Sequence, residues 1–183
     1  MAAQGNLSST AITNLGLTPP FRPTSGQEGG GSPLQDTVGI APATTTGATT
    51  GGILRMVRLP SNAIVRDIYI AQEAATTTAD FHVGAYYSNS TTDGTKAANV
   101  GLVLDADFFA TSVDTHLLIV WTSVMFEATT VKVTDTVKPL WEVLSLTEDP
   151  GGYIDLTLTN VATISGAAIL CMRVVWTRGG RPT

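Results

Sequence analysis

Cysteine is nearly absent from this sequence. The 183 residues include one cysteine, Cys171, so no disulfide can form within the chain and no set of thiolates can hold a zinc ion. Cys171 lies in the apolar stretch AAILCMRVVW, and a free cysteine in such surroundings packs as a small hydrophobic residue. We therefore expect Cys171 to be a buried residue of a strand.

Charged side chains are also scarce. They make up 14% of the residues, with a net charge of -5, whereas about 25% is usual for soluble globular chains. Binding to nucleic acid requires clustered lysine and arginine that displace counterions from phosphates, but this chain has only three lysines. The composition predicts a largely uncharged surface and argues against direct contact with nucleic acid.

Long apolar runs are missing as well. No stretch approaches the roughly 18 apolar residues of a membrane-spanning helix. The first positively charged side chain is Arg22, which does not fit the charged start of a secretory signal. We expect a soluble protein that is made in the cytoplasm and has no membrane partner.

Threonine is abundant instead. The chain contains twenty-nine threonines, and this β-branched residue suits the half-buried surface of a sheet. The hydrophobic fraction of 43% is sufficient for one core at this length. We expect one β domain, residues 53–183, preceded by an extended arm, residues 1–52.

The predicted arm has three charged residues, Arg22, Glu28 and Asp36, and no sustained strand or helix period. Such a segment cannot bury enough apolar surface to fold alone, so we expect it to be flexible when free. Within it, ITNLGLTPPFRP (residues 12–23) combines apolar side chains with prolines that favour an extended path. The arm residues expected to contact a partner are Ile12, Leu15, Leu17, Pro19, Pro20, Phe21 and Arg22.

Strand patterns dominate from residue 53 onward, because apolar and polar residues alternate between turn signals. The predicted strands are 53–59, 63–72, 80–88, 100–104, 116–121, 124–133, 139–146, 153–160 and 167–177. The last of them is apolar almost throughout, as in a central strand covered on both faces. The pattern predicts an all-β fold, an antiparallel β-sandwich of eight or nine strands, for which a jelly roll is the arrangement that fits best.

One short helix is predicted over residues 104–113, LDADFFATSV. Asp105 or Asp107 can accept hydrogen bonds from the first amides of a helix. Phe108 and Phe109 can then pack onto the sheets. We expect two helical turns at most.

A β-hairpin is predicted between residues 139–146 and 153–160. The intervening TEDPGG places Pro150 and Gly151 at the central positions of a type II turn. Alternation along the second strand places apolar residues inside and polar residues outside. The inward residues are Ile154, Leu156 and Leu158, and the outward residues are Asp155, Thr157 and Thr159.

Residues that could carry catalysis or bind a metal form no recognisable pattern. His82 and His116 lie within strand patterns, and two histidines without a nearby carboxylate make a weak metal site. Asp105 and Asp107 could serve a calcium loop or acid and base catalysis with a distant partner, but helix capping is the simpler interpretation. We expect no enzymatic activity, no metal and no cofactor, and a β-sandwich hydrolase is the least favoured hypothesis.

Three segments, GGILRMVRLPSNAIVRDIYIAQEAATTTADFHVGAYY, VLDADFFATSVD and AAILCMRVVWTRGG, carry a resemblance to a known family. Together they resemble the small β-sandwich cement, or head decoration, proteins of tailed bacteriophages. The resemblance implies an oligomeric jelly roll, a homodimer or homotrimer, on the outer surface of the capsid. It further implies that the protein bridges and stabilises subunits of the major capsid protein and has no enzymatic activity.

Within this hypothesis the arm has a function. Ordering a residue costs about 1 to 2 kcal/mol of backbone entropy, which contacts on a capsid lattice could offset. Residues 12–23 could be buried between subunits or could add a strand to the sheet edge of a neighbour. We therefore expect an arm that becomes ordered on the shell.

Two other virion roles stay open. Aromatic rings can stack on sugars, so a receptor- or carbohydrate-binding module, such as a head fibre or tail component, is the alternative function. Its candidate residues are Trp121, Trp141, Trp176, Tyr69, Tyr86, Tyr87, Tyr153 and the loop 88–99. In strands, however, such rings more commonly pack in a core or an interface. Another self-assembling coat protein with the same sandwich is the remaining possibility.

Overall fold

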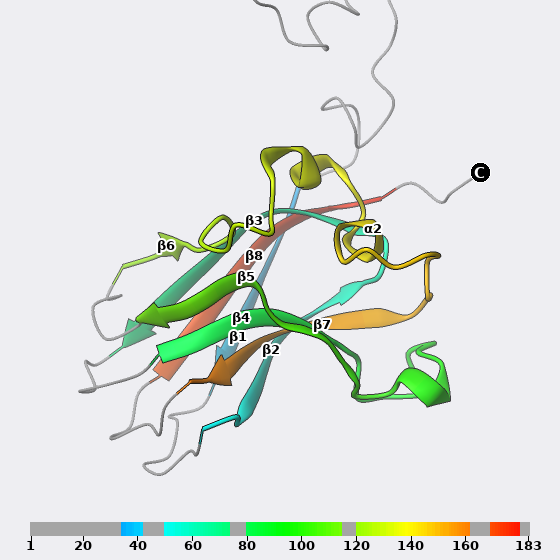
Figure 1. Ribbon diagram of the computed structural model, residues 1–183, viewed down its shortest axis with the longest axis horizontal. Coiled ribbons are helices and arrows are strands. Elements are labelled where there is room, and N and C mark those ends of the chain that lie inside the picture. The colour runs from blue at the N-terminus through cyan, green and yellow to red at the C-terminus, as the bar shows by residue number, and fades with distance from the viewer. Residues whose placement is uncertain (1–33, 42–49, 74–79, 115–119, 162–168, 180–183) are drawn as a thin grey trace, which may run out of the picture.

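The computed structural model describes residues 34–41, 50–73, 80–114, 120–161 and 169–179, which build a sandwich of two β-sheets (Figure 1). The strands are β1 (Gln35–Ala41), β2 (Ile53–Pro60), β3 (Ala63–Glu73), β4 (Asp80–Tyr87), β5 (Val103–Asp114), β6 (Thr122–Ser123), β7 (Tyr153–Asn160) and β8 (Ile169–Arg178). The helical segments are the 3-10 helices η1 (Ala97–Asn99) and η2 (Val133–Val137) and the short α-helix α2 (Leu140–Val143). The predicted all-β sandwich is therefore confirmed.

The strand order is that of a jelly roll. One sheet has the order β1-β8-β3-β6 and the other has the order β2-β7-β4-β5. The pairs β1 with β8, β2 with β7, β3 with β6 and β4 with β5 are all antiparallel. The chain thus follows one long hairpin that has been rolled into two sheets. Jelly rolls serve many unrelated functions, so this arrangement alone assigns none.

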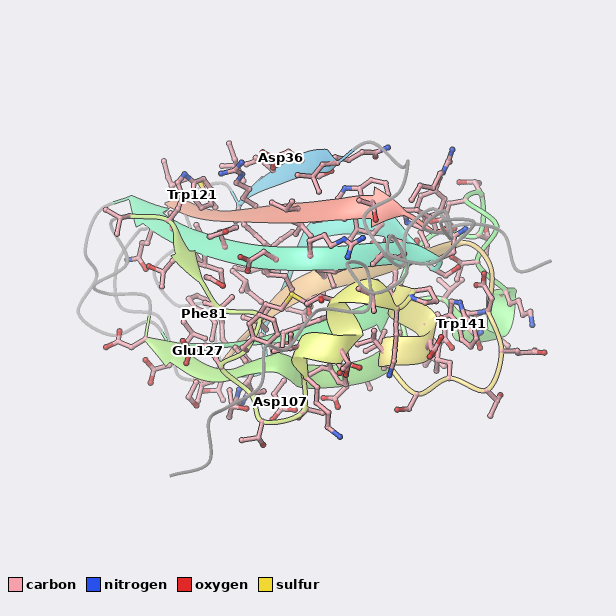
Figure 2. All side chains as sticks on the ribbon, turned by 90° about the horizontal axis from the view of Figure 1, so that it is seen from above. Asp36, Phe81, Asp107, Trp121, Glu127 and Trp141 are labelled. Carbon is pink, nitrogen blue, oxygen red and sulfur yellow. The ribbon has the colours of Figure 1, made fainter. Side chains whose placement is uncertain are left out.

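Side chains from the two sheets meet in one core. In Figure 2, which shows the two layers one above the other, Phe81 lies between them, and it is fully buried. The largest fully buried side chains are Phe81, Phe109, Leu59, Ile68, Ile70, Met125, Leu140, Ile154, Leu156, Leu158 and Leu170. Burying one such side chain contributes about 1.5 to 3 kcal/mol, so this core is the main source of stability.

Residues 104–113 form most of strand β5, and the predicted helix is wrong. Pairing with β4 outweighs the local helical signal, although three register shifts interrupt the pairing. At the largest shift, a single residue of β4, Gly84, lies opposite four residues of β5, 106–109. This bulge lets both Phe108 and Phe109 be buried, with their rings in an edge-to-face contact at 5.1 Å.

The predicted strand over residues 139–146 is also wrong. Pro139 has a φ of -65° and is the N-cap residue directly before α2, where the N–H of Leu144 donates to the carbonyl of Leu140 at 3.0 Å. Proline suits the start of a helix because its missing N–H would have no partner there. Leu140 is buried, which anchors the helix to the core. The predicted hairpin therefore does not form, and β7 pairs with β2 and β4 instead.

The predicted strand over residues 124–133 is wrong as well, because none of these residues is in a strand. The short strand β6 pairs with β3 through two residues, and the chain then continues in turns as far as η2. The N–H of Ala128 donates to the carbonyl of Phe109 at 3.0 Å, which ties this segment to β5. Of the predicted strand 116–121, residues 120 and 121 are not in a strand, and the others lie outside the described residues.

Strand β1 lies inside the range predicted to be an arm, so the expectation of no strand before residue 53 is wrong. β1 pairs with β8, and Trp176 of β8 donates from Nε1 to the hydroxyl of Thr37 at 3.0 Å. The inner side of β1 also approaches β2, because a Cβ on Gly39 would lie 1.9 Å from the carbonyl oxygen of Met56. The predicted contact residues of segment 12–23 lie outside the described residues.

Candidate interaction surface

The outer face of the sheet β1-β8-β3-β6 exposes apolar side chains of β1. More and less exposed residues alternate along this strand, so Asp36, Val38 and Ile40 point away from the core. Val38 is 51% exposed and Ile40 is 65% exposed. Leu34, which precedes the strand, is 67% exposed. Three large apolar side chains therefore reach solvent along this edge of the sheet.

Strands β8 and β3 continue the same face. The register places Ile40 beside Cys171 of β8, and Cys171 beside Ala71 of β3. Cys171 is half-buried, so the prediction of a buried cysteine is wrong in degree. The reason is that β8 is a central strand, as predicted, but its burial alternates and only its inner face is fully covered.

One ion pair crosses this face. Arg173 donates from Nε to Asp36 Oδ2 at 2.8 Å, and a second guanidinium nitrogen lies 2.6 Å from the same oxygen. The guanidinium also lies over the ring of Tyr69, 5.8 Å from the centroid. The hydrogen bond to Asp36 raises the pKa of Arg173 above its ordinary value. An exposed pair stabilises a fold little, so its main effect is that the two charges neutralise each other on the surface.

We call this surface the apolar face. It is formed by Leu34, Asp36, Val38, Ile40, Asp67, Tyr69, Ala71, Cys171, Arg173 and Val175. Figure 2 shows Trp121, which is 44% exposed, on the same side of the molecule as Asp36. An exposed apolar surface of this kind is typical of a contact with another macromolecule.

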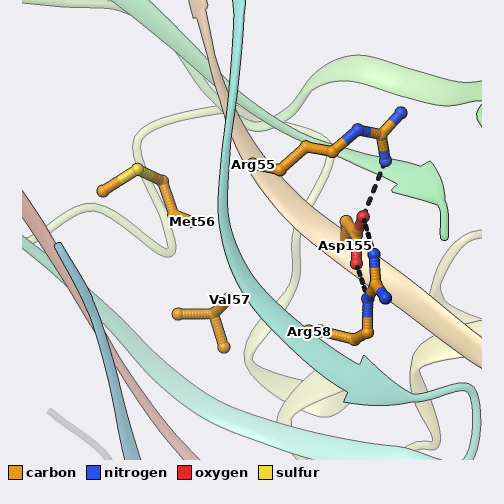
Figure 3. A pocket seen from close by; sticks show the side chains of 5 residues that line it. All are labelled: Arg55, Met56, Val57, Arg58 and Asp155. Atoms are coloured by element: carbon orange, nitrogen blue, oxygen red, sulfur yellow. Dashed lines mark hydrogen bonds and ion pairs between the residues drawn. The ribbon is translucent and has the colours of Figure 1, made fainter. Parts of the chain in front are cut away.

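The other sheet carries a network of ion pairs on its outer side (Figure 3). Asp155 of β7 is 1% exposed and accepts a hydrogen bond from Arg55 at 2.7 Å and two from Arg58 at 2.7 and 3.0 Å. In a regular strand, side chains three residues apart point to opposite faces. The register shift between Arg55 and Val57 turns both arginines toward Asp155.

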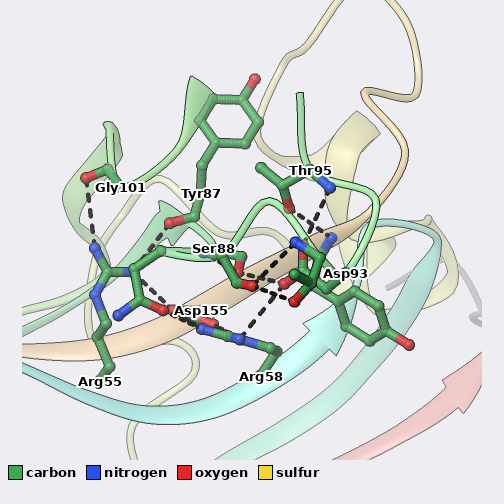
Figure 4. A network of polar contacts seen from close by, with 12 residues as sticks. Arg55, Arg58, Tyr87, Ser88, Asp93, Thr95, Gly101 and Asp155 are labelled. Carbon is green, nitrogen blue, oxygen red and sulfur yellow. Dashed lines mark hydrogen bonds and ion pairs between the residues drawn. The ribbon is translucent and has the colours of Figure 1, made fainter. Parts of the chain in front are cut away.

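The same arginines hold the loop that connects β4 to β5 (Figure 4). Arg55 donates to the carbonyl oxygens of Tyr87 and Gly101 at 3.0 and 3.4 Å, and its guanidinium lies 5.6 Å from the ring centroid of Tyr86. Arg58 donates to the loop as well. The network therefore joins β2, β7 and both ends of this loop.

Asp93 is the anionic member of the network within the loop. It accepts hydrogen bonds from the hydroxyl of Ser88 and, at 3.1 Å, from the N–H of Thr95, and it lies 3.4 Å from Arg58. Burial disfavours its charged form, but these hydrogen bonds and the charge of Arg58 outweigh burial and lower the pKa of Asp93. Two arginines thus balance the carboxylates of Asp93 and Asp155.

A cleft of about 300 Å³ lies against this network (Figure 3). Its lining consists of Arg55, Met56, Val57, Arg58 and Asp155. The guanidinium groups that line it are bound to Asp155 and to the loop. The chemistry of the cleft is therefore that of a structural ion pair, and we assign no ligand to it.

The acidic and histidine candidates do not converge. Asp105 and Asp107 lie in β5, where the N–H of Asp107 donates to Asp105 at 3.2 Å. Burial, with a smaller contribution from Asp107, raises the pKa of Asp105. His82 accepts a hydrogen bond from the N–H of Ser112 at 3.2 Å, and His116 lies outside the described residues. Within the part of the chain that the structure describes, no three potential metal ligands are grouped.

The tryptophans do not build one platform for a sugar. Figure 2 shows Trp121 and Trp141 at opposite ends of the molecule. Trp176 is 8% exposed and lies in β8 opposite Gln35.

The residues of β7 that were predicted to lie outside, Asp155, Thr157 and Thr159, are buried. Arg55 and Arg58 bind Asp155, and the hydroxyl of Thr157 donates to the carbonyl of Gly84 at 3.4 Å.

Sequence reasoning missed both the apolar face and the ion-pair network. Apolar residues at positions 34, 38 and 40 around one aspartate were the available signal for β1, but Gly39 between two of them weakened it. Nothing in the local sequence links Arg55 and Arg58 to Asp155, because that contact depends on the bulge and on long-range pairing.

The lowered pKa values predict how stability depends on pH. Asp135 resembles Asp93, because burial opposes its ionisation but bonds from the Lys132 N–H and the Lys138 ammonium lower its pKa. Carboxylates with lowered folded pKa values stabilise the fold above the unfolded pKa of about 4 and lose this contribution as the pH falls. We expect urea denaturation to show a lower free energy of unfolding at about pH 3 than at about pH 6.

The combined variant Asp93→Asn and Asp135→Asn should show a smaller fall in the free energy of unfolding as the pH is lowered between these two values. Asp105 is the matched control, because its raised pKa contributes in the opposite direction. In Asp105→Asn, the free energy of unfolding should therefore fall at least as much as in the wild type when the pH is lowered. An unchanged pH dependence in the combined variant would contradict the assignment.

Comparison with known proteins gives little guidance. No protein family model matches the chain, and no curated protein matches it. One similar solved structure is the capsid asymmetric unit of cyanophage Pam1, with a TM-score of 0.41 and 16% sequence identity over 97% of this chain and 99% of that chain. A superposition at this level establishes neither a common fold nor a common function. None of the helices in the described ranges is long and apolar enough to cross a membrane.

Proposed function

We propose that this chain is a non-enzymatic structural protein of a phage virion, a capsid cement or decoration protein. In this role it binds the major capsid protein on the outer surface of the head and stabilises the shell by bridging neighbouring subunits. The observation that carries the proposal is the apolar face, where Leu34, Val38 and Ile40 are each more than half exposed. Protein interfaces are depleted of charge at their centres, and the charges of Asp36 and Arg173 on this face neutralise each other.

The segments that resemble cement proteins support the same role. They coincide with strands β2 to β5 and with β8, which form most of both sheets of the jelly roll. The likeness therefore concerns residues that build the scaffold. A scaffold that presents an exposed sheet face, without convergent catalytic groups in the described residues, fits a binding role.

We further propose that residues 12–23 anchor the protein to the capsid. The apolar and proline residues of this segment, Ile12, Leu15, Leu17, Pro19, Pro20 and Phe21, would fit between capsid subunits, and Arg22 would provide a charged contact. Several copies engaging the shell at once would raise the overall affinity by roughly 100-fold or more over one contact.

Cosedimentation with phage heads stripped of this protein tests the proposal. The full-length chain should pellet with the heads, and a variant with both Leu17→Asp and Phe21→Asp should bind at least about tenfold more weakly, a loss of about 1.4 kcal/mol. A truncated chain without residues 12–23 should begin at Leu34 and not at Gly52, because it must keep residues 35–41, which form β1.

The matched control introduces the same charges at polar positions directly after this segment, with Thr24→Asp and Ser25→Asp. This variant should pellet like the wild type. If the full-length chain does not pellet, the cement function is rejected. If all variants pellet equally, the capsid contact lies outside residues 12–23.

A further inference from the structure

Strand β1 is an edge of its sheet and pairs on one side only within the described part of the chain. Its seven residues run without a register shift, from Gln35 opposite Trp176 to Ala41 opposite Leu170. The backbone N–H and C=O groups on its other side face away from the sheet. Such a row of groups is a template for pairing with a further strand.

The other three edges carry features that discourage such pairing, but β1 does not. Strand β2 has two arginines, a register shift and a terminal proline. Strand β5 has three aspartates and three register shifts, and β6 has only two residues. β1 contains no proline, lysine, arginine or bulge. Its one charged residue, Asp36, is paired with Arg173.

The sequence of β1 is compatible with antiparallel pairing to a second copy of itself. A two-fold axis at Val38 pairs all seven residues and keeps both members of each pair on one face of the sheet. Val38 then lies opposite Val38 of the second copy, and Asp36 lies opposite Ile40. An axis at Asp36 would instead place two carboxylates opposite each other, which is unfavourable.

Charge does not oppose this pairing. With the axis at Val38, the two Asp36 residues are offset by four positions, or about 13 Å along the strands. This separation exceeds the Debye length of about 8 Å at physiological ionic strength, and each Asp36 keeps its own Arg173. The exposed side chains of Val38 and Ile40 from the two copies would lie on one face of the joined sheet.

We propose that two copies of this chain pair antiparallel along β1, around a two-fold axis at Val38. The two four-stranded sheets then form one sheet of eight strands. The pairing is isologous, so it closes on itself and produces even-numbered assemblies. It does not rest on the proposed capsid role, because it can be measured without phage heads.

Sedimentation velocity of the full-length chain tests the pairing. One strand pair is a small interface, so we expect a reversible dimer with a dissociation constant in the range of about 1 to 100 μM. Val38→Lys would place two ammonium groups opposite each other and should weaken the dimer at least tenfold. Val103→Lys is the matched control, because Val103 is 55% exposed on the edge strand β5; it should leave the dimer unchanged.

A cross-link identifies the axis. In a Cys171→Ala background, Val38→Cys should yield covalent dimers with a short bismaleimide, whereas Val103→Cys should not. Circular dichroism should show the same thermal unfolding for the two lysine variants. A wild-type monomer at about 100 μM, a trimer, or equal dissociation constants for the wild type and Val38→Lys would overturn the proposal.

Discussion

Gly84→Ala is expected to lower the free energy of unfolding by about 3 kcal/mol, the upper end of the usual cost of overpacking a core. A Cβ at this position would lie 2.3 Å from the carbonyl oxygens of both Asp105 and Ala106. These atoms belong to the backbone of the β5 bulge, so no side-chain rotation can relieve the contact. β4 lies between β7 and β5, and separating it from β5 would disturb the burial of Phe109.

Urea denaturation followed by tryptophan fluorescence measures this loss. The matched control is Gly51→Ala, because a Cβ on Gly51 meets no atom within 4 Å although its φ is +82°. Backbone conformation alone should cost Gly51→Ala about 1 kcal/mol. Equal losses in the two variants would show that the close approach of β5 to Gly84 does not restrict this position.

Local sequence was sufficient where local signals and long-range pairing agree. Ser61 and Asn62 form the predicted turn between β2 and β3, and the alternation of residues 153–160 correctly predicts β7. Together with the other alternating segments, these elements supported the prediction of a sandwich. Which strands pair with each other was not predicted, because no short window of sequence contains both members of a pair.

The failures occur where a bulge or a short helix breaks the alternation. Phe108 and Phe109 are adjacent, and adjacent residues of a regular strand cannot both face one core, so a helix was the natural interpretation. The bulge opposite Gly84 removes this restriction. In residues 139–146, apolar residues spaced for a strand instead form α2, because Pro139 favours a helix start.

Strand β1 was missed because its stability is almost entirely non-local. Asp36 and Gly39 lower the strand propensity of this segment, and its pairing partner β8 lies at the far end of the sequence. Gly39 is required because the carbonyl of Met56 occupies the space of a side chain. The same residue that weakened the sequence signal therefore permits the strand to pack.

Asp155→Ala is expected to destabilise the fold by about 3 kcal/mol. Removing one member of a buried ion pair leaves an uncompensated charge, which costs about 3 to 5 kcal/mol. The lower value applies because the side chains of Arg55 and Arg58 are 25% and 37% exposed and can be partly hydrated. The loop between β4 and β5 should also exchange its amide hydrogens faster, because these arginines hold it.

Asp36→Ala separates the effect of burial from the effect of ion-pair geometry. Asp36 lies 2.6 Å from Arg173, as close as Asp155 lies to its arginines, but its side chain is 46% exposed, against 2% for Asp155. Water can replace the lost partner at an exposed pair, so urea denaturation should show no measurable change for Asp36→Ala. If the two variants lose similar stability, the network around Asp155 is hydrated in solution and does not hold the loop.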